Sequence, residues 1–201
     1  MKKQILIIHG GRAYSTHDAF LDKLQTRVID NPFQSRFFKW KDTLSAELGE
    51  GYEVCFPEMP NKEYAKYKEW KIWLERHLEF LRDDVTLIGH SLGGYFLAKY
   101  LSENNMSVAI GSLYLVAAVY ESDNFEGEDG GDFNFDPKNL PQIAEKVENI
   151  HILHSKDDPV VPYEHALKFK EALPRAELMT FEDKGHFNME EFPELVGMVR
   201  G

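Results

Sequence analysis

The sequence predicts a single α/β domain of three layers, in which helices cover both faces of a mostly parallel sheet of about six strands. Its 201 residues are close to one typical domain length, so we treat residues 1–201 as one unit. Hydrophobic residues make up 43% and charged residues 28%, a composition typical of a globular chain. Short apolar runs alternate with longer segments of helical period, which is typical of a parallel sheet with covering helices.

Six short apolar runs, bounded by turn or charged residues, are the predicted strands. They span residues 4–9, 52–56, 85–89, 110–117, 150–154 and 177–181. Because segments of helical length separate most of them, we expect the strands to lie mostly parallel in one sheet.

The clearest helix is predicted over residues 61–81, where large apolar residues recur at steps of three and four and define one buried stripe. A second helix is expected to start after Ser91 and to end near Glu103, where Asn104 supplies a stop. The remaining predicted helices span residues 35–48, 138–147, 162–172 and 193–199.

The net charge indicates which classes of partner are unfavourable, and the cysteine content indicates the redox compartment. Lys and Arg number 23 against 34 Asp and Glu, a net charge of −11, which disfavours nucleic acid and anionic membranes. Cys55 is the single cysteine, lies in an apolar run and fits a buried thiol in a reducing compartment. The first apolar stretch, residues 5–8, is too short for a signal peptide or a membrane span. We therefore expect a soluble cytoplasmic protein.

Residues 121–137 form an acidic, glycine-containing segment without periodicity, which predicts a long mobile loop and a candidate lid. Within it, the acidic spacing from Asp132 is similar to the start of a calcium loop, but Pro137 and Ile143 stand where glycine and glutamate are needed. His151 and His154 have the spacing of a metal-binding pair, but on a strand this spacing places them on opposite faces, where they cannot share a metal ion. We expect neither a metal nor a cofactor.

The strongest local motif is Gly89-His90-Ser91-Leu92-Gly93, placed between an apolar strand and a helix. This is G-x-S-x-G in the context that a nucleophile elbow requires: the serine sits on a strained turn, and the glycines leave room for close neighbours. The helix that follows supplies N–H groups and the positive end of its dipole near the serine, where an oxyanion must form. Ser91 is therefore the predicted nucleophile.

A serine nucleophile needs a base, and the base needs a carboxylate that holds its tautomer. After the fifth predicted strand comes an acidic loop with Asp157 and Asp158, and after the sixth comes a loop with His186. The order Ser91, Asp158, His186 is the chain order of one known triad architecture.

Three segments carry a resemblance to a known family: GHSLGG, HSKDDPVVP and GHFNMEEFPEL. On these segments the chain resembles the α/β-hydrolases, and within them the small serine hydrolases related to retinoblastoma-binding protein nine. The resemblance implies an α/β-hydrolase fold with a reduced sheet. It also favours Asp158, which precedes Pro159, as the triad acid, with Asp157 as the alternative because adjacent acids cannot be separated by sequence.

The resemblance also implies an oxyanion hole and a pocket. Such folds use the N–H of the residue after the nucleophile and a second N–H from the loop after the first strand. Here these are Leu92 and Gly11, with Arg12 as the alternative to Gly11. His9, Arg12 and His90 are the predicted substrate-binding residues, and residues 13–18 are expected to shape the same rim.

Two features depart from the family. The connection over residues 16–51 is longer than the usual first crossover and is interrupted at Asn31-Pro32, so it is expected to add cap surface. Cys55 is followed by Phe56-Pro57, so the chain lacks the L-x-C-x-E ligand for pocket proteins, and the namesake's binding activity is not implied.

The expected function is that of a serine hydrolase, a carboxylesterase that cleaves small or medium acyl esters through an acyl-enzyme. The expected partner is a small-molecule acyl substrate, and no protein partner is implied. An amidase or peptidase and a thioesterase are alternatives on the same triad, since the pocket decides the leaving group. A non-catalytic protein-interaction module is the alternative from another class.

Overall fold

The computed structural model describes residues 1–29, 33, 39–122 and 129–201. Six strands form one sheet in the order β2-β1-β3-β4-β5-β6, and every neighbouring pair is parallel. The strands are β1 (Lys3–Ile8), β2 (Tyr52–Cys55), β3 (Val85–His90), β4 (Ile110–Val116), β5 (Val147–Ser155) and β6 (Glu177–Phe181). All six predicted strands are confirmed, and the carboxyl ends of the strands meet at one edge of the sheet.

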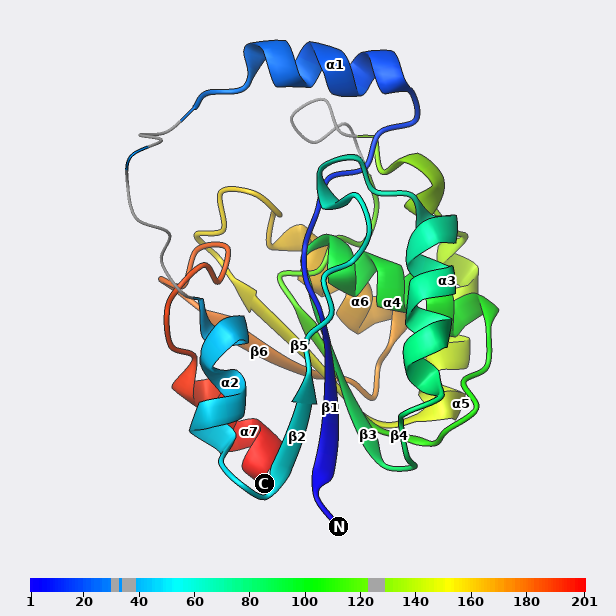
Figure 1. Cartoon of the computed structure of the whole chain (residues 1–201), viewed down its shortest axis with the longest axis vertical. Helices are drawn as coiled ribbons and strands as arrows, with labels where there is room; N and C mark the ends of the chain where they lie inside the picture. Colours follow the sequence, from blue (N-terminus) through cyan, green and yellow to red (C-terminus); the bar gives the residue numbers. More distant parts are fainter. Residues whose placement is uncertain (30–32, 34–38, 123–128) are drawn as a thin grey trace.

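Helices cover both faces of this sheet, so the three-layer prediction is confirmed (Figure 1). One face carries α3 (Tyr67–Leu78), α4 (Leu92–Glu103), α5 (Ile143–Lys146) and α6 (Glu164–Ala172), and the other carries α2 (Trp40–Leu48) and α7 (Pro193–Arg200). Each face of the sheet has its own hydrophobic core, and alternate residues of a strand point into the two cores. In β1, Leu6 packs in the core under α4, and Ile7 packs in the core that contains Trp40.

Two predicted helices are shorter than expected. The helix expected over 61–81 begins only at Tyr67, after the 3-10 turn η1 (Lys62–Tyr64). The helix expected over 138–147 is divided into η3 (Pro137–Gln142) and α5, with Pro141 inside η3. Of the helix expected over 35–48, residues 40–48 form α2, and residues 35–38 lie outside the described residues.

Helix α1 (His17–Thr26) was not predicted, because none of its residues is buried and it therefore lacks the apolar stripe that identifies a packed helix. The Thr16 hydroxyl accepts from the Ala19 N–H and caps its start. Figure 1 shows α1 beyond the carboxyl ends of the strands. Phe20 stacks on Tyr64, with 4.9 Å between the ring centroids. The long crossover thus places a helix at the carboxyl ends of the strands.

The segment expected to be a mobile loop is packed in its second half. The Asp129 carboxylate accepts from the N–H groups of Ser15 and Gly131, and Phe133 of the 3-10 turn η2 (Gly131–Phe133) is fully buried. Residues 123–128, like Asn31-Pro32, lie outside the described residues, and the lid remains a prediction. Among the described helices none is long and apolar enough to cross a bilayer.

Candidate active site

Ser91 occupies a strained turn between β3 and α4, as the elbow motif predicts. Its φ is 56° and its ψ is −122°, a conformation that non-glycine residues rarely adopt. The Ser91 N–H donates to the carbonyl of Val116 (2.9 Å), and the Ser91 carbonyl accepts from the N–H groups of Gly94 and Tyr95. These bonds hold the strained backbone and present the serine at the start of α4.

The elbow glycines are required by close backbone approach. A Cβ at Gly93 would lie 2.2 Å from the carbonyl oxygen of Ile8, and a Cβ at Gly94 would lie 2.4 Å from the Cβ of Ala118. A Cβ at Gly89 would lie 2.7 Å from the Cα of Gly94. These distances are too short for any side chain, so α4 packs against the strand ends only because these positions lack one.

We expect Gly93→Ala to lower the free energy of unfolding by about 3 kcal/mol or more, because backbone at Ile8 would have to move. Gly197→Ala is the matched control: Gly197 lies in α7, and its added Cβ would meet nothing within 4 Å. This control should stabilise by about 0.5–1 kcal/mol. Urea unfolding measures both values, and a Gly93→Ala protein as stable as the wild type would contradict the close approach.

Asp158 and His186 meet at the edge of the sheet where β5 and β6 end. His186 Nδ1 lies 2.9 Å from Asp158 Oδ2 and 3.1 Å from Oδ1. The Asp158 side chain is fully buried, and its Oδ1 accepts from the N–H groups of Val160 (2.8 Å) and Val161 (2.9 Å). Backbone donors thus hold the carboxylate in place against the imidazole.

Asp157 faces a different set of partners. Its Oδ1 accepts from the Ser155 hydroxyl (2.5 Å) and from the Gly185 N–H (2.9 Å). The Ser155 hydrogen bond, followed by that of Gly185, lowers the pKa of Asp157. Asp157 therefore ties the loop after β5 to the loop that carries His186, whereas Asp158 contacts the imidazole itself.

The ring of His90 packs against the ring of His186 beside the Ser91 turn. The rings of His90 and His186 have centroids 4.9 Å apart, and His90 directly precedes the serine. Among the described residues, no hydrogen bond joins the Ser91 hydroxyl to His186. Such bonds are often long in free enzymes and tighten when substrate binds.

The loop after β1 lies directly against the serine. A Cβ at Gly10 would lie 3.1 Å from the Ser91 Cβ, and one at Gly11 would lie 3.2 Å from Leu92 Cδ2. The Arg12 N–H donates to the carbonyl of Lys62 (2.7 Å), which leaves it unavailable to a ligand. Within the described residues, neither the Gly11 N–H nor the Leu92 N–H donates to another protein group.

The imidazole of His9 contacts protein groups on both ring nitrogens. His9 Nε2 accepts from the Met59 N–H (2.8 Å), and its Nδ1 contacts the carbonyl of Gly10. Burial lowers the pKa of His9, as it does more strongly for His90. Burial thus favours the neutral form of both rings. The substrate-binding role predicted for His9, Arg12 and His90 remains a prediction.

Sequence reasoning missed two buried residues beside the site. His154 Nε2 contacts the carbonyl of Val161 (2.8 Å) and lies 3.7 Å from Asp158 Oδ2. The other missed residue is Lys41, whose Nζ lies 3.4 Å from His90 Nδ1 and 4.6 Å from the ring centroid of Trp40. A lysine inside a predicted helix is ordinarily a surface residue, so no local pattern could identify Lys41.

Burial lowers the pKa of Lys41 from its usual 10.5 to about 7, with a smaller contribution from Lys39. Between these values the unfolded chain holds a proton that the folded chain has released, so stability should rise with pH. We expect the free energy of unfolding to rise by up to about 1.4 kcal/mol per pH unit between about pH 7.5 and 9.5.

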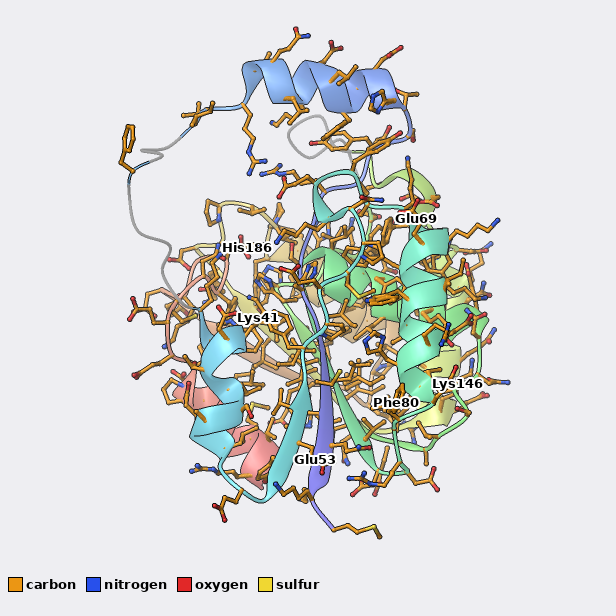
Figure 2. The ribbon with its side chains drawn as sticks, in the orientation of Figure 1. Lys41, Glu53, Glu69, Phe80, Lys146 and His186 are labelled. Atoms are coloured by element: carbon orange, nitrogen blue, oxygen red, sulfur yellow. The ribbon has the colours of Figure 1, made fainter. Side chains whose placement is uncertain are left out.

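Urea unfolding across this pH range checks the expectation in three proteins. Lys41→Met should lose the rise, and Lys146→Met should keep it, because Lys146 donates to the carbonyls of Leu101 and Asn104 at the other end of the domain. Figure 2 shows Lys41 near His186 and Lys146 on the opposite side of the molecule. An equal rise in the Lys41→Met protein would contradict the lowered pKa.

Histidines elsewhere on β5 do not combine into a metal centre. His151 stacks on Tyr114 on one face of the sheet, whereas His154 packs near Tyr163 on the other. In the described parts of the chain, no group of three His, Cys, Asp or Glu residues could hold a metal ion.

A parallel six-stranded sheet, a serine on a strained elbow and a buried carboxylate–imidazole pair define the class of α/β-hydrolases. The family model described as Serine hydrolase matches residues 34–194. The chain belongs to this serine hydrolase family, and the resemblance found in the sequence is confirmed.

Among curated relatives, the chain is similar to YdeN of Bacillus subtilis (strain 168), which is named as a hydrolase. The two are 26% identical over 199 residues, and the alignment covers 95% of this chain and 89% of YdeN. It is 27% identical over 150 residues to the serine hydrolase RBBP9 of Rattus norvegicus, covering 75% of this chain and 77% of RBBP9.

Two solved structures share the fold. The structure of the ydeN gene product of B. subtilis aligns over 99% of this chain and 97% of its own, with 21% identity and a TM-score of 0.68. The structure of MGS-MChE2, an α/β hydrolase enzyme from a sediment metagenome of the lagoon of Mar Chica, Morocco, aligns over 100% and 89%, with 22% identity and a TM-score of 0.60.

Proposed function

We propose that this serine hydrolase is a carboxylesterase that acts on small or medium acyl esters through a Ser91-His186-Asp158 triad. The observation that carries the proposal is the fully buried Asp158 carboxylate 2.9 Å from His186 Nδ1, at the same edge of the sheet as the Ser91 elbow. An ionised carboxylate there keeps the proton on Nδ1, so that Nε2 is free to act as the base.

In the proposed reaction, Ser91 Oγ attacks the ester carbonyl while its proton passes to His186 Nε2. Asp158 stabilises the resulting imidazolium. The imidazolium then gives its proton to the leaving alcohol, and an acyl-enzyme remains on Ser91. Water repeats the sequence: it loses a proton to His186, releases the carboxylic acid and restores the serine.

We assign the oxyanion hole to the N–H groups of Leu92 and Gly11. The support is that both N–H groups lack a protein acceptor within the described residues and that both residues lie against the serine turn, whereas the Arg12 N–H is occupied. Two preorganised donors stabilise the negative charge that develops on the carbonyl oxygen. Arg12 remains a candidate substrate contact through its side chain.

The rival activities share this machinery. An amidase or peptidase and a thioesterase would use the same triad, because the pocket decides the leaving group. A non-catalytic interaction module would keep the fold without turnover. We place the protein in the cytoplasm, because its single cysteine, Cys55, fits a reducing compartment. We infer that its partner is a small-molecule acyl substrate, and that the reaction involves no metal, cofactor, nucleic acid or membrane.

Intact-mass analysis after treatment with a fluorophosphonate probe tests the proposal without a known substrate. A single adduct supports an activated serine, and hydrolysis of p-nitrophenyl esters faster than matched thioesters and anilides supports the esterase. Faster cleavage of the thioesters or anilides would favour the corresponding rival. A folded protein that takes no adduct and turns over no substrate would favour the interaction module.

A further inference from the structure

The first residues of α2 fasten the loop that carries His186. Trp40 Nε1 donates to the carbonyl of Phe187 (3.0 Å), and the Trp40 N–H donates to the carbonyl of Met189 (3.1 Å). His90 Nε2 lies 2.9 Å from the carbonyl oxygen of His186 itself. Phe187 has a φ of 51°, so this short loop is also held in a conformation that non-glycine residues rarely adopt.

The hydrogen bond to the His186 carbonyl determines the tautomer of His90. A carbonyl oxygen only accepts, so His90 Nε2 must carry the proton. In the neutral ring, Nδ1 is then an acceptor and needs a donor, because His90 is only 4% exposed. Lys41 Nζ, 3.4 Å from Nδ1 and on a side chain that is itself buried, is placed to be that donor.

We propose that Lys41 and His90 form a positioning relay for the catalytic histidine, in which Lys41 Nζ donates to His90 Nδ1 and His90 Nε2–H donates to the main-chain carbonyl of His186. The relay rests on the proposed function, since it positions the base assigned there. The variable position of the G-x-S-x-G elbow thus supplies a second histidine, which holds the loop of the catalytic one.

Loss of Lys41 should disturb the base rather than the fold. His90 Nδ1 would lose its donor, and the ring could then move its proton to Nδ1, which would set the Nε2 lone pair against the His186 carbonyl oxygen. The His186 loop would shift to relieve this repulsion. A displacement of about 1 Å at a catalytic group can cost about a hundredfold in rate.

The rate of fluorophosphonate labelling, followed by intact mass, measures the relay in the full chain. We expect Lys41→Met to label at least about tenfold more slowly than the wild type, with unchanged or higher stability because the cost of burying the Lys41 amine is removed. Lys146 donates to two main-chain carbonyls and lies far from His186, so Lys146→Met should label at the wild-type rate.

His90 variants separate a relay from two independent contacts. His90→Leu should lower the labelling rate as much as Lys41→Met does. The double variant should be no slower than either single variant, because both residues act through the same relay. His90→Gln keeps an N–H donor toward the His186 carbonyl and should recover most of the rate. With p-nitrophenyl acetate, kcat should fall in Lys41→Met while KM stays near its wild-type value.

Wild-type labelling rates in Lys41→Met, or fully additive losses in the double variant, would overturn the relay. The nitrogen chemical shifts of the His90 ring, measured by NMR on the wild-type protein at pH 8, give an answer that depends on no variant. A protonated Nε2 supports the relay, and a protonated Nδ1 refutes it. If the wild type takes no probe at all, the proposed function fails, and the His90 tautomer still decides the relay.

Discussion

Ser91→Ala is expected to abolish ester hydrolysis and fluorophosphonate labelling while the protein stays folded. Removal of the nucleophile from a serine triad lowers kcat by a factor on the order of 10⁶, so the variant should be inactive in an ordinary assay. The fold should survive because the bonds that hold the elbow are made by the Ser91 backbone, which alanine keeps. Turnover of p-nitrophenyl acetate and urea unfolding measure the two effects.

Ser102→Ala is the matched control for this variant. Ser102 lies on the same helix, is 2% exposed, and its hydroxyl donates to the carbonyl of Lys99. Its loss should change stability slightly and activity not at all. A Ser91→Ala protein that still hydrolyses the ester at the wild-type rate would show that another residue is the nucleophile.

Asp158→Asn should lower kcat by a factor on the order of 10⁴, as the equivalent change does in the triad template. The amide oxygen would stay with the N–H groups of Val160 and Val161, which leaves its NH₂ group facing His186 Nδ1. Nδ1 would then have to accept, and the proton would move to Nε2. A histidine protonated there cannot take the proton of Ser91.

Asp157→Asn is the matched control one residue away. Its amide oxygen can still accept from Ser155 and Gly185, so we expect a loss of only a few fold in kcat. Steady-state kinetics of both variants decide between the two acids. A larger loss from Asp157→Asn than from Asp158→Asn would assign the triad acid to Asp157.

The parts of the site that could be predicted from sequence are local. Ser91 was recognisable because an elbow needs its glycines next to the serine, and the close approach of Gly93 to Ile8 is the physical reason for that spacing. Helix α1 escaped prediction because it buries none of its residues. The burial of Lys41 was not predicted, because it comes from tertiary packing at the active-site end of the sheet and leaves no pattern in the neighbouring residues.

The six strands, the elbow and the class of chemistry could be predicted from the sequence, because runs of apolar residues and a glycine-serine turn depend on neighbours along the chain. Which of two adjacent aspartates faces His186, and that the Gly11 N–H rather than the Arg12 N–H lacks an acceptor among the described residues, could be learned only from the folded chain. These outcomes depend on hydrogen bonds between distant segments, such as that of Trp40 with Phe187, 147 residues apart in the chain. Such partners become neighbours only when the sheet brings its strand ends to one edge.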